Sequence, residues 1–107
     1  MYVEDLGRPA HFFIPADKWT HEGVKELVHT FLIENYDGYT IRGPFTGNWR
    51  PQTGNSPITE SVYEVKVSFK GKERIPKLQE FLAEICFSMG ERCLYLETGE
   101  DSWLIYP

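Results

Sequence analysis

Apolar residues recur at the spacing of an α-helix in two stretches of the chain. In each stretch they stand three and four positions apart, which puts them on one stripe of a helix surface. The first stripe comprises Val24, Leu27, Val28, Phe31 and Leu32, and the second comprises Ile75, Leu78, Leu82, Ile85 and Met89. We predict two amphipathic helices that bury these stripes.

Capping and turn residues bound both predicted helices. Thr20 can cap the first helix with its hydroxyl. We expect this helix to end at Asp37-Gly38, because glycine accepts the left-handed conformation that closes helices. Pro76 suits the first turn of the second helix, where backbone amides have no partner within the helix, and Gly90 ends it.

Apolar residues at every second position indicate strands, and the compact apolar run at 10–14, which Pro15 ends, indicates a buried one. The predicted strands cover residues 10–14, 39–50, 58–70, 92–98 and 102–106. The third strand has one face with Tyr63, Val65, Val67 and Phe69, and another with Glu60, Val62, Glu64, Lys66 and Ser68. The first face is predicted to meet the helices, and the last two strands are predicted to pair as a hairpin around residues 99–101.

The second predicted strand is interrupted by Gly43-Pro44, and a proline cannot donate to a neighbouring strand. We therefore predict a bulge or bend at a sheet edge. Simple alternation gives this strand one face with Tyr39, Ile41, Phe45 and Trp49, and another with Thr40, Arg42, Thr46, Asn48 and Arg50. Residues 51–57 are polar and rich in turn formers, which predicts a loop of the kind that carries binding groups.

The order of the elements is strand, helix, strand, strand, helix, strand, followed by one short strand. This order predicts an α+β fold of the ferredoxin-like βαββαβ type with an extra C-terminal strand. The sheet should be antiparallel, with both helices on one face. With 107 residues, the chain is expected to form a single domain over 1–107, in which 1–8 are an N-terminal lead.

Composition and charge narrow the range of partners. An apolar content of 41% is that of a globular protein. The net charge of -5, with interspersed signs, argues against a surface for duplex nucleic acid. Without a signal pattern or an apolar run long enough to span a bilayer, we expect no membrane contact and a cytoplasmic location. We expect Cys86 and Cys93 to be free thiols, which suggests a reducing compartment.

The stretch 39–60 departs most from regular secondary structure, so we look for function there. Trp49 and Arg50 end a strand, and Glu60 begins the next one after a loop. A carboxylate at such a place can be partly buried and held by amides, but it can equally be a surface residue, and Trp49 can equally be a core aromatic.

Other kinds of chemistry find no support in the sequence. The three histidines lack the spacing of metal ligands, and we expect no metal site. The sequence contains no recognisable nucleophile motif, phosphate-binding loop or dinucleotide fingerprint, and we expect no cofactor.

The sheet face away from the helices is predicted to be half polar and half apolar. Ferredoxin-like domains commonly cover this face by assembling, and a symmetric assembly brings side chains of neighbouring subunits together. We expect a homo-oligomer whose subunit junctions are candidate sites.

Several segments resemble, in order and spacing, the small bacteriophage S-adenosylmethionine lyases, long called hydrolases. The likeness spans residues 8–107, and part of it, Gly-x-Trp-Arg followed by Glu, also resembles an uncharacterised bacterial domain family. The segments are Ala-His-Phe-Phe-Ile at 10–14, Gly-Tyr-Thr at 38–40, Thr-Gly-Asn-Trp-Arg at 46–50, Thr-Glu at 59–60 and Arg-Cys-Leu-Tyr at 92–95.

The resemblance implies a trimer with ligand between subunits, and conversion of S-adenosylmethionine to methylthioadenosine and homoserine lactone. In the family a glutamate at the start of a strand holds the substrate ammonium, and Glu60 matches it. An aromatic residue, usually tyrosine, precedes the loop, and here it is Trp49, which lacks the phenol hydroxyl. A related adenosyl-sulfonium nucleotide is therefore an alternative substrate. Arg50, Thr59 and Phe13 complete the expected substrate-binding set.

Two readings without catalysis remain open from the sequence. One is a module that binds and sequesters a nucleotide, or a regulatory ferredoxin-like domain. The other is a structural oligomer without a ligand.

Overall fold

The computed structural model describes residues 1–21, 23–50 and 56–107. Its elements are β1 (Arg8–Pro15), α1 (Ala16–Trp19), α2 (Val24–Tyr36), β2 (Thr40–Trp49), β3 (Ile58–Phe69), the 3₁₀ turn η1 (Lys72–Arg74), α3 (Ile75–Met89), β4 (Leu94–Thr98) and β5 (Ser102–Ile105). The strands form one sheet in the order β2-β3-β1-β4-β5, and all neighbours are antiparallel. The predicted ferredoxin-like α+β fold with an added C-terminal strand is confirmed.

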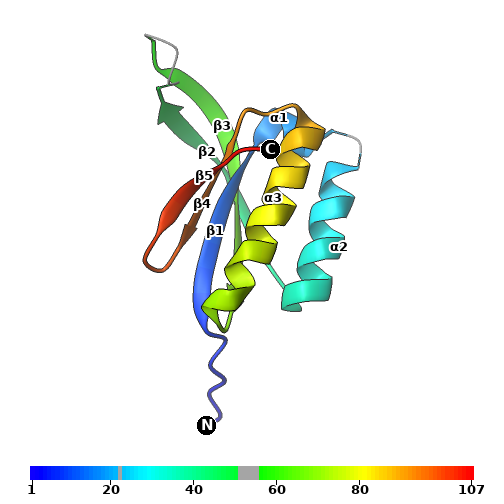
Figure 1. Ribbon diagram of the computed structural model, residues 1–107, viewed down its shortest axis with the longest axis vertical. Helices are drawn as coiled ribbons and strands as arrows, with labels where there is room; N and C mark the ends of the chain where they lie inside the picture. The colour runs from blue at the N-terminus through cyan, green and yellow to red at the C-terminus, as the bar shows by residue number, and fades with distance from the viewer. Residues whose placement is uncertain (22, 51–55) are drawn as a thin grey trace.

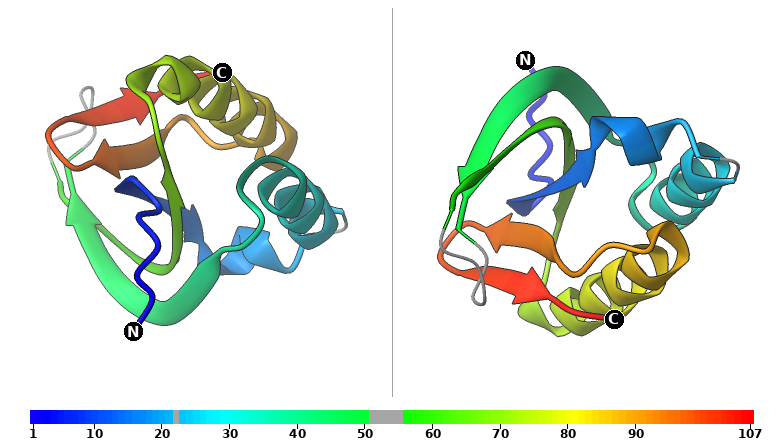
Figure 2. Two further views of the ribbon diagram at one scale, coloured as in Figure 1. Left: turned by 90° about the horizontal axis from the view of Figure 1, so that it is seen from below. Right: turned by 90° about the horizontal axis from the view of Figure 1, so that it is seen from above.

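The two long helices, α2 and α3, lie together on one face of the curved sheet (Figures 1 and 2). The core lies between them and the sheet, and β3 contributes alternate residues to it: Val65, Val67 and Phe69. Tyr63 packs against the edge of this core. The predicted assignment of the two faces of β3 is confirmed, because an unbroken strand turns every second side chain to the same side.

The residues that cap α2 differ from the prediction, although the helix ends before Asp37-Gly38 as expected. Thr20 does not cap α2, whose N-cap is Gly23. Thr20 instead follows the short helix α1, which was not predicted, and its hydroxyl donates to the carbonyl of Asp17 at 3.0 Å. Asp37, with φ 63°, takes the left-handed position that was expected of Gly38. Leu27 is 51% exposed, so the buried stripe of α2 is narrower than predicted. By contrast, α3 ends at a left-handed Gly90, as expected.

The predicted bulge in β2 is present, and it changes which residues share a face. Arg42 pairs with Glu64 and Phe45 pairs with Val62, so β2 spends three positions where β3 spends two. Gly43, at φ 123°, adopts a backbone conformation that side chains disfavour.

The prediction that Tyr39, Ile41, Phe45 and Trp49 share a face is wrong. Tyr39 and Ile41 pack against the core. Phe45 lies opposite Val62, on the face away from the helices. The physical reason is that one extra residue in a strand reverses the alternation beyond it.

Beyond the bulge, β2 and β3 continue as a hairpin past the rest of the sheet (Figure 1). Of the predicted loop 51–57, residues 51–55 lie outside the described part of the chain. The hairpin and the β4–β5 pair flank the face that carries no helix.

Among the described residues, no helix combines the length and apolar character needed to cross a membrane.

Candidate functional site

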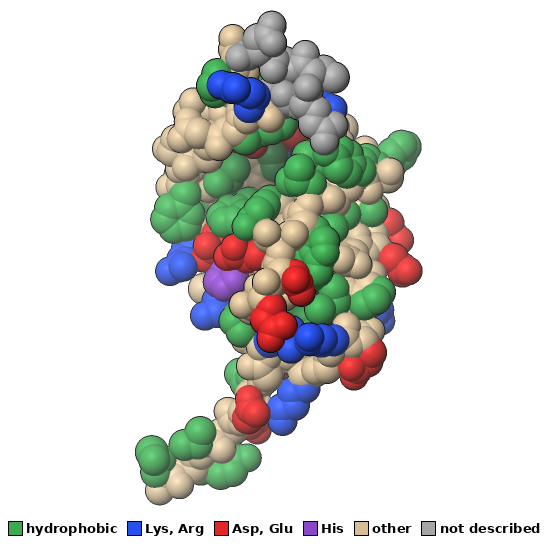
Figure 3. Space-filling view, turned by 60° about the vertical axis from the view of Figure 1, so that its left-hand side comes forward, with side chains coloured by type: hydrophobic (Ala, Val, Ile, Leu, Met, Phe, Trp, Pro, Cys, Tyr) green, Lys and Arg blue, Asp and Glu red, His purple; other side chains and the backbone are tan. Residues whose placement is uncertain are grey.

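A cavity of about 400 Å³ lies on the sheet face opposite the two long helices. Figure 3 shows hydrophobic side chains gathered around a hollow on this face, with a histidine and charged side chains below it. The cavity is bounded by the β2–β3 hairpin, by the end of β1, and by β4, β5 and the turn before β4. It is lined by Phe13, Pro15, Phe45, Thr46, Gly47, Asn48, Trp49, Arg50, Glu60, Val62, Glu91, Arg92, Cys93, Leu94, Tyr95 and Leu104.

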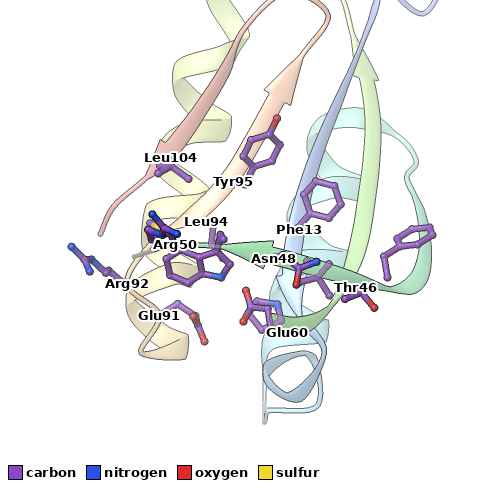
Figure 4. Close-up of a pocket in the computed structure, with 16 residues that line it drawn as sticks. Phe13, Thr46, Asn48, Arg50, Glu60, Glu91, Arg92, Leu94, Tyr95 and Leu104 are labelled. Carbon is purple, nitrogen blue, oxygen red and sulfur yellow. The ribbon is translucent and has the colours of Figure 1, made fainter. Parts of the chain in front are cut away.

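One wall of the cavity is aromatic and apolar. The rings of Phe13 and Tyr95 have their centres 5.7 Å apart, and Leu104 lies beyond them on β5 (Figure 4). The Tyr95 hydroxyl donates to Glu97 at 3.0 Å, which holds the ring in place. This hydrogen bond raises the pKa of the Tyr95 phenol, with desolvation adding to the rise. A flat apolar group can pack against this wall.

The β2–β3 hairpin forms the second wall. Phe45, Gly47 and Trp49 alternate along β2 on the cavity side, because the bulge has moved them there. Gly47 stands directly opposite Glu60 in the neighbouring strand, and it has no side chain to cover that carboxylate. Trp49 remains 37% exposed. An aromatic ring and a carboxylate therefore line the same side of the cavity.

A second carboxylate, Glu91, enters the cavity from the turn between α3 and β4 (Figure 4). Burial raises the pKa of the Glu91 carboxyl above its usual range, and the charge of Glu60 adds to the rise, against an opposing effect of Lys18. Two contacts with Cys86 fix the backbone of Glu91. Its amide donates to the Cys86 carbonyl at 3.0 Å, and the Cys86 thiol donates to its carbonyl at 3.3 Å.

The cavity also carries two positive charges. Arg50 follows β2 and Arg92 follows Glu91, and both lie toward the same side of the cavity (Figure 4). Within residues 1–21, 23–50 and 56–107 neither guanidinium has an ion-pair partner. The cavity thus offers acidic and basic groups to a ligand that carries both signs of charge.

The structure gathers four of the five residues that the sequence analysis selected. Phe13, Trp49, Arg50 and Glu60 all line the cavity. Thr59 does not line it. Its hydroxyl donates to the side-chain carbonyl oxygen of Asn48 at 2.7 Å, one step along the hairpin from Trp49 and Glu60.

Sequence reasoning missed two important residues of the lining. Glu91 follows the helix-ending Gly90 and belongs to no periodic pattern, and the segment used for the resemblance begins one residue later, at Arg92. Phe45 was placed on the wrong face. The predicted bulge was itself the signal that would have corrected it, had the extra residue been counted.

A polar cluster lies beside the cavity on the same sheet face. The Arg42 Nε donates to Glu64 Oε1 at 2.7 Å, and His11 Nδ1 lies 3.6 Å from the same oxygen. Desolvation raises the pKa of the Glu64 carboxyl, but the hydrogen bond and charge of Arg42, with a smaller effect of His11, outweigh it and leave the pKa below its usual value. Glu64 is therefore held ionised although it is buried.

Metal binding finds no support in the described part of the chain, where no three His, Cys, Asp or Glu side chains are grouped to hold an ion.

Comparison with known proteins gives matches in structure and none in sequence. No family model matches the chain, and no curated protein matches it. A phage SAM lyase in complex with S-methyl-5'-thioadenosine matches with a TM-score of 0.65 and 14% identity, covering 100% of this chain and 97% of the lyase chain. A phage SAM lyase in the apo state matches with a TM-score of 0.61 and 15% identity over the same shares. The chain has the fold of these lyases, so the resemblance is confirmed for the fold.

Proposed function

We propose that the protein is a lyase of S-adenosylmethionine, or of a related adenosyl-sulfonium nucleotide, that forms methylthioadenosine and homoserine lactone. The observation that carries the proposal is the meeting of Trp49, Glu60 and Glu91 at one cavity. A sulfonium and an ammonium are the two cationic centres of such a substrate, and an aromatic face and carboxylates attract cations. The shared fold with phage SAM lyases supports the proposal.

The reaction needs neither water nor an external base. A carboxylate oxygen of the substrate attacks its own γ-carbon, the C–S bond breaks, and the electron pair of that bond stays on sulfur. The products are a neutral thioether and a five-membered lactone whose amino group remains protonated. The protein therefore has to fold the methionine tail into reach of the γ-carbon and remove water from the attacking carboxylate.

The change in the substrate's charges during the reaction indicates which side chain of the cavity binds which cationic centre. The sulfonium loses its positive charge as the C–S bond breaks, whereas the ammonium keeps its charge throughout. A carboxylate against the sulfur would stabilise the bound substrate more than the transition state and slow the reaction. We therefore assign Glu60 and Glu91 to the ammonium. The face of Trp49 is assigned to the sulfonium, because a ring attracts a cation more weakly than a carboxylate does and so costs the reaction less.

The remaining lining suits the rest of the substrate. The wall formed by Phe13, Tyr95 and Leu104 is assigned to the adenine ring, because it is flat and apolar. Arg50 is assigned to an anionic group outside the reacting methionine tail, such as a phosphate of a nucleotide-conjugated substrate. Thr59 acts, in this proposal, by orienting Asn48 rather than by touching the ligand.

We also propose that the protein works as a homo-oligomer, a trimer, in the cytoplasm of a bacterial host cell. Apolar side chains at the cavity rim stay exposed in the single chain: Leu104 is 52% exposed and Phe45 is 44% exposed. A neighbouring subunit that covers this rim would exclude water from the cavity, as the reaction requires. Duplex nucleic acid and membranes are not among the proposed partners.

The second candidate is a protein that binds and sequesters an adenosyl ligand without converting it. It is favoured by one observation, that the aromatic residue at the cavity is Trp49, which has no phenol hydroxyl to take part in chemistry. Incubation with S-adenosylmethionine, followed by chromatography, separates the candidates. A lyase yields methylthioadenosine, whereas a sequestering protein returns the ligand unchanged.

A further inference from the structure

Arg42 and Glu64 form a close ion pair outside the cavity, and its two members are very unequally exposed. The Arg42 Nε to Glu64 Oε1 distance is 2.7 Å, and the side chains are 63% and 11% exposed. Taking a carboxylate out of water costs free energy that only a well-placed partner offsets. Glu64 therefore favours a β2 register in which Arg42 stands directly opposite it, as it does here.

The same guanidinium reaches the cavity wall. The Arg42 Cζ lies 5.8 Å from the centre of the Phe45 ring, within the range of a cation–π contact. Phe45 follows three positions later and lines the cavity opposite Val62. Arg42 thus contacts the buried carboxylate on β3 and an aromatic ring of the cavity at once.

The bulge lies between these two contacts, at Gly43 and Pro44. If the extra residue were lost from this place, the alternation beyond it would reverse. Phe45 and Trp49 would then turn toward the helix side of the sheet. Thr46 and Asn48 would turn their side chains into the cavity, which would lose its aromatic wall on the hairpin.

We propose that Arg42 and Glu64 are positioning residues that fix the β2 register, and thereby hold Phe45 and Trp49 in the wall of the cavity. His11, 3.6 Å from Glu64 on the β1 side, supports the carboxylate from the other side. This proposal depends on the proposed function only in one respect, the choice of methylthioadenosine as the ligand in the binding test. The register itself can be measured without any ligand.

The test uses the whole chain and two readouts. Nuclear Overhauser contacts between the Phe45 ring and the Val62 methyl groups report the register of β2 against β3. Calorimetric titration with methylthioadenosine measures the affinity of the cavity for this ligand. In Arg42→Ala the contacts should disappear and the dissociation constant should rise about tenfold. Glu64→Gln keeps the shape of the side chain, so it should fold even where Arg42→Ala does not, and it should show the same changes to a smaller extent.

Two further variants separate positioning from general stability. The charge exchange Arg42→Glu with Glu64→Arg should restore the Phe45–Val62 contacts and most of the affinity. Lys72→Ala removes an exposed ion pair with Glu100 at 3.4 Å, remote from the cavity, and should change neither readout. The proposal is overturned if Arg42→Ala and Glu64→Gln both keep the contacts and bind methylthioadenosine within twofold of the wild type. If the wild type does not bind methylthioadenosine at all, that result counts against the proposed function. The Phe45–Val62 contacts still show whether Arg42 and Glu64 fix the register.

Discussion

Glu60 and Glu91 line one cavity although they come from distant parts of the chain, the first residues of β3 and the turn after α3. Their charges interact strongly enough for Glu60 to contribute to the raised pKa of the Glu91 carboxyl, after the larger effect of burial. Two carboxylates that repel each other are costly to the empty protein. A cation placed between them relieves that cost, so the pair is suited to bind one.

Replacing Glu91 should weaken binding and stabilise the fold at the same time. A carboxyl whose pKa is raised by folding destabilises the folded state above that pKa, and the penalty fades as the pH falls through it. Glu91→Gln removes the penalty, so its unfolding temperature at pH 7 should exceed that of the wild type. Its affinity for S-adenosylhomocysteine, which carries an ammonium, should fall, while its affinity for methylthioadenosine, which has none, should change little.

The pH dependence gives Glu91 a second signature. In the wild type, affinity for S-adenosylhomocysteine should decline as the pH falls toward the raised pKa of Glu91, because the protonated carboxyl no longer attracts the ammonium. In Glu91→Gln this decline should be shallower. Equal pH profiles for the two proteins would contradict the assignment of Glu91 to the ammonium.

Trp49 should discriminate ligands by the charge on sulfur. S-adenosylmethionine carries a sulfonium and S-adenosylhomocysteine a neutral thioether, so the ratio of their affinities isolates the cation–π contribution. Trp49→Leu should lower this ratio roughly fivefold, whereas Trp49→Phe should largely keep it. The ratios are measured by titration in a background that turns over slowly, such as Glu60→Gln. An unchanged ratio in Trp49→Leu would contradict the assignment of the sulfonium to Trp49.

The proposed trimer makes a prediction that does not depend on catalysis. Light scattering should give three times the 12.5 kDa mass of one chain. Leu104→Glu, at the exposed rim of the cavity, should lower the mass to that of a single chain. Phe87→Glu provides the matched control, because Phe87 is 77% exposed on α3, which lies on the other side of the sheet. A single-chain mass for the wild type would contradict the trimer.

The sequence alone was sufficient for the elements whose patterns are local. The two faces of β3 follow from uninterrupted alternation, and the end of α3 follows from Gly90, so both predictions are confirmed. The end of α2 at Asp37-Gly38 was also predicted correctly, but Asp37 and not the glycine adopts the left-handed conformation.

The candidate site was predictable where its residues lie near one another in sequence. Trp49, Arg50 and Glu60 flank a single loop, and the structure places all three at the cavity. Glu91 reaches the same cavity only because the order β3-β1-β4 brings the turn before β4 near the start of β3. Phe45 depends on counting one residue through a bulge. Neither of these two follows from local periodicity.

The central claim is tested most directly by incubating the wild-type protein in excess with S-adenosylmethionine and separating the products by chromatography. The account predicts methylthioadenosine and homoserine lactone in equal amounts. Glu60→Gln should reduce turnover on the order of 10²-fold, because it removes a charge that holds the ammonium, with an unfolding temperature close to that of the wild type. The control Glu100→Gln, on the exposed β4–β5 turn, should match the wild type. Recovery of unchanged S-adenosylmethionine from excess wild-type protein would contradict the claim.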